Sequence, residues 1–309
     1  MIVGVLRETA PAERRVALTP DQVRELGCEV LVERSAGARA GFPDARYRDA
    51  GAEIVDRSEL LARAELVAWV KPPVYQLDSL RPGAVTLGFQ DPMHRAAAIA
   101  ELSERAIESV GFETVPHHMA EIDALSAMSR IAGSVAYSEG RQLISGADHR
   151  NPVRALIIGC GQAGLAAVAE GAKGGDEIIA MGNRPQQARL AAAAGADHFI
   201  LSGSRCRILT ATPDLIICAA VRRGERGPVL LDETVLAALP SGTVIVDLVA
   251  KSGGNCAGVV PDRTVMLPNG VIITHRSNYP AARPQEASLA YGAAVAAMIH
   301  LRVARRNTP

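Results

Sequence analysis

The sequence lacks an excess of charge of either sign, because 33 lysine and arginine residues balance 33 aspartate and glutamate residues. A strongly basic or acidic surface is typical of proteins that bind nucleic acid or charged membranes, so neither partner is expected. No uninterrupted apolar run reaches the roughly 18 residues that a bilayer-spanning helix needs. The first residues carry no positively charged leader, so we also expect no signal peptide.

Cysteine is scarce, and the spacing typical of a zinc site or a disulfide framework is absent. The five cysteines stand at positions 28, 160, 206, 218 and 256, without a C-x-x-C pair. An odd number of unpaired cysteines favours reduced thiols, a cytoplasmic protein and no metal site. At 309 residues the chain is long enough for two domains.

The most informative pattern lies between residues 153 and 170. A short apolar run at 155–158 predicts a buried strand, glycines follow at 159, 161 and 164, and an alanine-rich segment then predicts a helix. In such a unit the first glycine permits a tight turn, the second lets a diphosphate approach the backbone, and the third lets the helix lie close to the strand. With a further strand expected at 177–181, this pattern predicts a dinucleotide site rather than a structural glycine turn.

Strand and helix patterns alternate through the first part of the chain, which predicts parallel β-α-β units and an α/β fold. Strands are expected at 2–6, 28–33, 52–55, 66–70, 84–89, 106–109 and 111–115. A helix should begin near Pro20 with Thr19 as its N-cap, and residues 126–144 predict a long helix that links two domains. Ligands of parallel sheets bind beyond the carboxyl ends of the strands, so Lys71, Gln90 and Asp91 are well placed for a site.

Several separated motifs resemble one family, which contains alanine dehydrogenase and the NAD-binding alpha subunit of proton-translocating transhydrogenase. Arg7-Glu-Thr, followed by the stretch 13–20 (Glu-Arg-Arg-Val-Ala-Leu-Thr-Pro), is similar to the family's opening motif. The stretches 123–133, 246–256 and 279–288 resemble the transhydrogenase subunit. Lys71 in Val-Lys-Pro-Pro and the stretch 112–115 are closer to the dehydrogenase.

The resemblance implies two Rossmann-like domains with parallel sheets, a cleft between them and a long linking helix. The substrate domain should comprise residues 1–130 and 286–309, and residues 131–285 should bind NAD(P). In the dehydrogenase, the residues that match Arg15 and Lys71 hold the carboxylate and the oxo group of a 2-oxo acid. A guanidinium group suits the first task because it grips a carboxylate at two points. The alternative for both residues is a surface salt bridge.

The chain also departs from both branches of the family. Asp91 stands where the dehydrogenase has its acid/base histidine, and His94 follows three residues later. A carboxylate can do acid/base work when its pKa is raised toward the operating pH, but Asp91 could equally cap the next helix. The loop before Asp123 lacks the arginine and glutamine that the transhydrogenase subunit normally carries.

The end of the second nucleotide-domain strand predicts NADP, with NAD as the alternative. NAD-preferring sites usually carry an acid there, whereas this chain has Gly182, and Arg184 and Arg189 could pair with a 2′-phosphate. We expect the cofactor to contact Gly159, Gly161, Gln162, Ala163, Gly164, Asn183, Arg184, Arg189, Ala219, Ala220, Asp247 and Leu248.

The leading hypothesis is an NAD(P)H-dependent oxidoreductase that acts at an amino, imino or oxo group beside a carboxylate, with Arg15, Lys71 and Asp91 as catalytic residues. Its substrate would be a 2-oxo acid, an amino acid or an imine, and we expect a homo-oligomer, in the first place a dimer. Two alternatives stay open. One is a transhydrogenase-like component that passes hydride to a nucleotide on a partner, and the other is a redox-silent relative that binds nucleotide.

Overall fold

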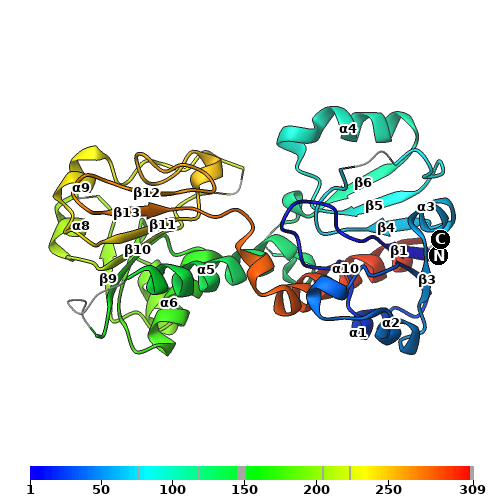
Figure 1. Cartoon of the computed structure of the whole chain (residues 1–309), viewed down its shortest axis with the longest axis horizontal. Coiled ribbons are helices and arrows are strands. Elements are labelled where there is room, and N and C mark those ends of the chain that lie inside the picture. The colour runs from blue at the N-terminus through cyan, green and yellow to red at the C-terminus, as the bar shows by residue number, and fades with distance from the viewer. Residues whose placement is uncertain (75–76, 117, 145–150, 204, 223, 307–309) are drawn as a thin grey trace. The chain divides into compact units, whose positions relative to one another are not determined.

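The structure, a computed structural model, describes residues 1–309 except 75–76, 117, 145–150, 204, 223 and 307–309. The chain forms two compact units (Figure 1). Unit 1 contains Met1–Met128 and Pro280–Pro309, and unit 2 contains Ser129–Tyr279. Unit 1 is therefore assembled from the two ends of the chain.

Unit 1 is built on a six-stranded sheet in which all neighbouring strands are parallel. In spatial order the strands are β3 (Glu53–Val55), β2 (Glu29–Glu33), β1 (Ile2–Val5), β4 (Leu66–Ala68), β5 (Val85–Gly88) and β6 (Glu108–Gly111). Its helices are α1 (Pro20–Glu25), α2 (Asp44–Asp49), α3 (Arg57–Arg63), α4 (Pro92–Glu104) and α10 (Pro284–Arg306). Helix α1 begins as predicted, with Thr19 as N-cap and Pro20 in the first turn.

Helices cover the sheet of unit 1 through close contacts. Helix α3 packs on β1, where a Cβ atom on Gly4 would lie 2.6 Å from Leu60 Cδ2. Helix α10, red in Figure 1, packs against α1. The stretch Pro284–Ala304 of α10 is long and apolar enough to cross a membrane, but half of its most apolar part is buried inside the structure. One such helix is weak support for a membrane span, because the buried core helix of a soluble protein has the same composition.

The prediction of a strand at residues 111–115 is wrong. Strand β6 ends at Gly111, and Phe112–Thr114 forms a 3-10 turn. The fully buried Phe112 turns into an aromatic cluster, with its ring centroid 6.1 Å from that of Phe89 and 5.5 Å from that of Tyr291. Tertiary packing therefore overrides the local β propensity.

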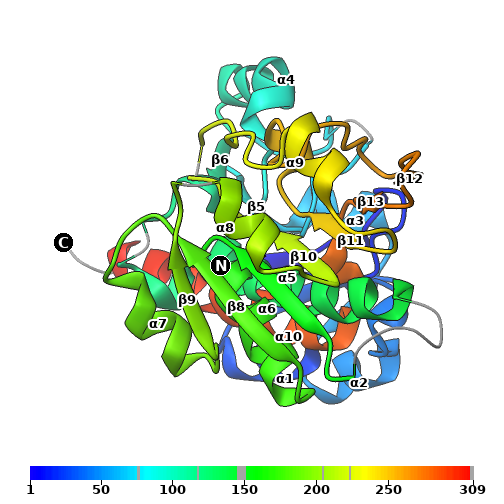
Figure 2. The same cartoon turned by 90° about the vertical axis from the view of Figure 1, so that its left-hand side faces the viewer.

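Unit 2 contains a seven-stranded sheet that is parallel except for β12. In spatial order the strands are β12 (Thr264–Met266), β13 (Ile272–Thr274), β11 (Val244–Asp247), β10 (Leu215–Cys218), β7 (Arg154–Ile158), β8 (Glu177–Gly182) and β9 (His198–Leu201). Its helices are α6 (Gln162–Lys173), α7 (Gln187–Ala193), α8 (Arg205–Thr210) and α9 (Glu233–Ala238), together with most of α5 (Ala124–Leu143). Figure 2 shows α7 beside the parallel strands β8 and β9.

Both faces of this sheet are covered, as expected for a parallel sheet whose strands are apolar on both sides. One face packs α5 and α6: a Cβ atom on Gly140 of α5 would lie 2.7 Å from Val246 Cγ2 and 2.8 Å from Leu215 Cδ1. The other face packs α8 and α9 through a core that includes Leu156 and Ile216. The predicted α/β fold with parallel sheets is confirmed.

Candidate functional site

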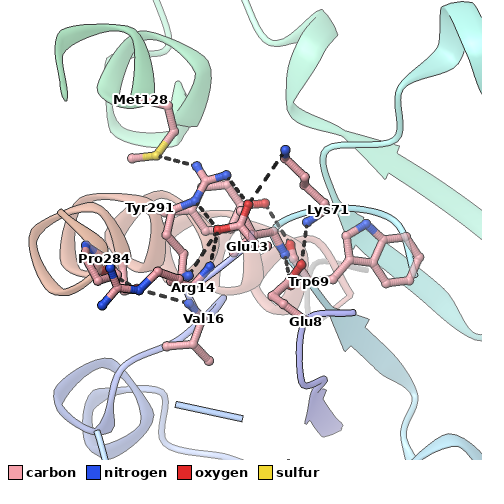
Figure 3. Close-up of polar contacts among 12 residues, drawn as sticks. Glu8, Glu13, Arg14, Val16, Trp69, Lys71, Met128, Pro284 and Tyr291 are labelled. Atoms are coloured by element: carbon pink, nitrogen blue, oxygen red, sulfur yellow. Dashed lines mark hydrogen bonds and ion pairs between the residues drawn. The ribbon is translucent and has the colours of Figure 1, made fainter. Parts of the chain in front are cut away.

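Two cations of unit 1 converge on one buried carboxylate (Figure 3). The guanidinium of Arg15 donates from Nε to Glu13 Oε1 at 2.7 Å and from Nη2 to Glu13 Oε2 at 2.6 Å. Lys71 Nζ lies 3.9 Å from the same Oε2 atom. Glu13 is fully buried and Arg15 is 3% exposed, whereas the side chain of Lys71 keeps about a third of its surface exposed. The Arg15 pair is thus an interior ion pair and not the surface salt bridge that the sequence left open.

These residues meet because they follow neighbouring strands of a parallel sheet. Glu8, Glu13 and Arg15 come after β1, and Lys71 comes after β4, which pairs with β1. The side chain of Glu8 joins the two segments, since its oxygens accept the backbone N–H of Val70 at 2.6 Å and that of Lys71 at 3.1 Å. Glu8 therefore fixes the backbone from which Lys71 extends.

The two glutamates of this cluster differ in ionisation. Burial raises the pKa of Glu8 to about 8 in spite of the two N–H groups that it accepts. Burial acts in the same direction on Glu13, but the hydrogen bonds and charge of Arg15 hold the pKa of Glu13 below its ordinary value. Near neutral pH, Glu8 is then mostly uncharged, and one carboxylate faces two cations. Two cations beside the Glu13 carboxylate suit a ligand that carries a carboxylate of its own.

Asp91 lies at the end of β5, next to the end of β4. It is the N-cap residue of α4, but its side chain makes no capping hydrogen bond. Asp91 Oδ1 instead lies 2.8 Å from Nδ1 of the exposed His94. The structure thus pairs Asp91, the candidate for acid/base work, with an imidazole three residues later in the chain.

A residue that sequence reasoning missed holds this turn in place. Glu113 Oε1 accepts the backbone N–H groups of both Gln90 and Asp91, each at 2.8 Å. Asp91 has a φ of 51°, in the left-handed region that non-glycine residues seldom adopt. The two hydrogen bonds offset the cost of that conformation. Glu113 lies in the stretch 112–115, but only the structure shows which backbone groups its side chain holds.

The predicted dinucleotide turn of unit 2 is packed as tightly as its glycines require. Gly159 has a φ of 109°, and a Cβ atom on it would lie 2.7 Å from the backbone oxygen of Ala219. A Cβ atom on Gly164 would lie 1.7 Å from the backbone oxygen of Gly159, so only glycine allows α6 to start here. By contrast, a Cβ atom on Gly161 would meet nothing within 4 Å. The middle glycine therefore faces space that a diphosphate could occupy.

Helix α5 supplies a cation to the start of α6. A Cβ atom on Gly133 would lie 1.9 Å from the backbone oxygen of Ala163, so the two helices touch there. One turn earlier, Nη1 of the exposed Arg130 donates to Gln162 Oε1 at 2.8 Å. Arg130 lies in the stretch 123–133, but its partner on the next helix could not be identified without the structure.

The loop after β8 presents exposed polar residues. Asn183, Arg184 and Arg189 are all exposed. Gln187, which was not among the expected contacts, accepts with its Oε1 atom the backbone N–H of Asn183 at 2.9 Å and that of Arg184 at 3.1 Å. Its side chain therefore shapes the loop.

The ends of β10 and β11 carry the remaining expected contacts, Ala219, Ala220, Asp247 and Leu248. Asp247 is fully buried and accepts the backbone N–H groups of Val249, Asn255 and Cys256 at 2.7–2.9 Å. Burial raises the pKa of Asp247, and these three N–H groups offset part of the rise. Asn255 in turn exchanges two hydrogen bonds of 2.9 Å with the backbone of Ala220. Asp247 thus acts on the loop around the strand ends, and Asn255, which was not among the expected contacts, joins that loop to Ala220.

Comparison with known proteins gives matches over both units. Residues 4–132 match the description "Alanine dehydrogenase/PNT, N-terminal domain", and residues 133–308 match "Alanine dehydrogenase/PNT, C-terminal domain". The NAD(P) transhydrogenase subunit alpha of Cereibacter sphaeroides is 30% identical over 97% of this chain, which spans only 65% of that relative. The alanine dehydrogenase of Bacillus subtilis is 30% identical over 94% of this chain and 82% of its own length. A crystal structure of transhydrogenase from Sinorhizobium meliloti superposes with a TM-score of 0.91 and 26% identity, covering 98% of this chain and 94% of that one.

Proposed function

Because this chain belongs to the alanine dehydrogenase/PNT family, whose members are nucleotide-dependent oxidoreductases, we propose that it transfers hydride between NAD(P)H and the carbon of an amino, imino or oxo group next to a carboxylate. The substrate would be a small 2-oxo acid, an amino acid or the related imine. The observation that carries this proposal is the convergence of Arg15 and Lys71 on Glu13.

Each residue of the cluster has a distinct task in this proposal. Arg15 binds the substrate carboxylate with the guanidinium edge that now faces Glu13, so Glu13 must share or yield part of that edge. Lys71, which is more exposed, donates to the oxo or imino group and draws electron density from the carbon. Asp91, paired with His94, gives a proton to the oxo or imino group when its carbon is reduced and takes it back in the reverse reaction.

The residues of unit 2 fit a dinucleotide. The turn at Gly159, Gly161 and Gly164 would hold the diphosphate, and the open space beside Gly161 supports this assignment. The bound nicotinamide supplies or accepts the hydride. NADPH is our preferred cofactor, because the end of β8 lacks an acid while Arg184 and Arg189 stand exposed beside it.

The test is nicotinamide absorbance in the presence of NADPH or NADH and a panel of 2-oxo acids, with and without ammonia. Lys71→Ala should abolish turnover and keep nucleotide binding, since Lys71 belongs to unit 1 and the glycine turn to unit 2. Lys173→Ala is the matched control, because this exposed lysine ends α6. Full activity of Lys71→Ala would eliminate the mechanism.

A second candidate is a transhydrogenase-like component that passes hydride to a nucleotide on a partner protein. It is favoured by the similarity to the transhydrogenase alpha subunit over 97% of this chain. Such a protein would bind nucleotide, reduce a nucleotide analogue only with a partner present, and ignore every acid of the panel. A redox-silent relative would bind nucleotide, but the nicotinamide absorbance would change neither with a partner protein nor with any acid of the panel.

We further propose a cytoplasmic homo-oligomer, in the simplest case a dimer. Among the described residues, Cys28, Cys160, Cys218 and Cys256 are free thiols, which supports a reducing compartment. Light scattering of the purified protein would measure the number of subunits.

A further inference from the structure

Gln187 lies at the point where NAD-selective sites carry an acid. It is the first residue of α7, and its Oε1 atom would lie 2.5 Å from a Cβ atom on Gly182, the last residue of β8. An acid at the end of this strand normally accepts a hydrogen bond from the 2′-hydroxyl of the NAD ribose. In this chain the side chain of Gln187 occupies the space that a side chain at position 182 would need.

The orientation of the Gln187 amide follows from its hydrogen bonds. Two backbone N–H groups, those of Asn183 and Arg184, point at one atom of the amide at 2.9 and 3.1 Å. That atom must be the oxygen, because an NH₂ group cannot accept from them. The nitrogen Nε2 is therefore the other terminal atom, and it donates to no residue in the described part of the chain. Gln187 is half-buried, so this donor is held in a fixed place and still reaches solvent.

We propose that Gln187 is a specificity-determining residue that donates from Nε2 to the 2′-phosphate of NADPH. This inference rests on the proposed nucleotide-dependent function. A phosphate accepts hydrogen bonds and carries negative charge, so it fits a fixed donor beside two exposed arginines, Arg184 and Arg189. A 2′-hydroxyl would find no carboxylate acceptor at Gln187 or Gly182.

The test replaces the donor and keeps the acceptor. In Gln187→Glu, one carboxylate oxygen still accepts the two backbone N–H groups, while the other puts a negative charge where Nε2 was. The Kd for NADPH should rise roughly tenfold to a hundredfold, the range expected for a lost hydrogen bond to a charged group. The Kd for NADH should stay equal or fall. Gln186→Glu is the matched control, because it adds the same charge one residue earlier, at an exposed side chain without a capping hydrogen bond.

Binding is measured by titration of nicotinamide fluorescence, with thermal melts to confirm folding. Gln187→Ala serves as a second variant: it loses the donor and the loop acceptor, so both Kd values rise, and that for NADPH rises more. If the wild-type protein binds neither nucleotide, the proposed function fails and this inference fails with it. The other outcome is that the wild type binds nucleotide, but the ratio of the Kd for NADPH to the Kd for NADH is the same in Gln187→Glu, Gln187→Ala and Gln186→Glu. That result would overturn only the role of Gln187.

Discussion

Replacing Arg15 by methionine tests the interior ion pair most directly. Glu13 is fully buried and receives two hydrogen bonds from the Arg15 guanidinium, at 2.7 and 2.6 Å. Arg15→Met removes both of these hydrogen bonds from the buried carboxylate and leaves Lys71 as a cation 3.9 Å away. Removal of one partner of a buried pair costs about 3–5 kcal/mol of unfolding free energy. We expect a loss within this range.

A second substitution should restore most of that loss. In the double variant Arg15→Met with Glu13→Gln, the buried carboxylate is gone, and the charge that loses its Glu13 partner is that of Lys71, whose side chain is one third exposed to water. The amide oxygen of residue 13 can still accept the backbone N–H groups of residues 14 and 15, which now reach Glu13 Oε1 at 3.1 and 3.0 Å. We therefore expect the double variant to lie within about 1 kcal/mol of wild type, which is the net worth of one ordinary hydrogen bond. The double-mutant cycle then gives the coupling energy of the pair.

The pH dependence provides an independent check. In wild type the pKa of Glu13 is lowered in the folded state, so its contribution to stability is present above its unfolded value of 4.5 and is lost as the pH falls. In Arg15→Met, burial without the guanidinium raises the pKa of Glu13, so this variant loses stability as the pH rises above 4.5. The deficit of the variant should therefore grow between about pH 5 and pH 7.

Urea unfolding at both pH values, followed by circular dichroism, measures these free energies. A deficit below about 1 kcal/mol is what an exposed ion pair gives. That result, or a double variant that is no better than Arg15→Met, would refute the interior pair.

Three further predictions concern groups outside this pair. The pKa of Glu8 is about 8 in the folded protein and 4.5 in the unfolded chain, so the free energy of unfolding of the wild type should fall as the pH rises through this window, by up to about 1.4 kcal/mol per pH unit. Glu8→Gln should remove that slope when urea unfolding is measured at a series of pH values. An unchanged slope would mean that Glu8 is ionised in the folded protein. Gly164→Ala should lower the free energy of unfolding by roughly 1–3 kcal/mol, because its Cβ would lie 1.7 Å from the backbone oxygen of Gly159. In Gly161→Ala the added Cβ meets nothing within 4 Å, so this variant should keep its melting temperature and bind nucleotide more weakly. Equal melting temperatures for the two variants would contradict this packing. Arg184→Ala should raise the Michaelis constant for NADPH and leave that for NADH nearly unaffected, and a clear preference of the wild type for NADH would count against an NADP site.

Local sequence patterns determined the fold class and the glycine-rich turn between β7 and α6. The strand at 155–158 and the three glycines after it form a continuous segment, so the chemistry of each residue can be interpreted from its immediate neighbours. The same holds for the start of α1 at Thr19 and Pro20. The resemblance to alanine dehydrogenase and the transhydrogenase subunit, confirmed by matches over residues 4–132 and 133–308, also came from the sequence.

Only the tertiary structure decided what surrounds each candidate residue. The sequence selected Arg15 and Lys71, but it did not predict that both would meet the buried carboxylate of Glu13, or that Glu8 would fix the backbone of Lys71. Glu113 reaches Gln90 and Asp91 from the 3-10 turn after β6, and Arg130 reaches Gln162 from another helix. Such contacts join residues far apart in the chain. Those of unit 1 form because neighbouring parallel strands end at the same edge of a sheet, and that of Arg130 forms because α5 packs on α6. Burial, which sets the pKa of Glu8, likewise depends on the whole packed unit and on no local pattern.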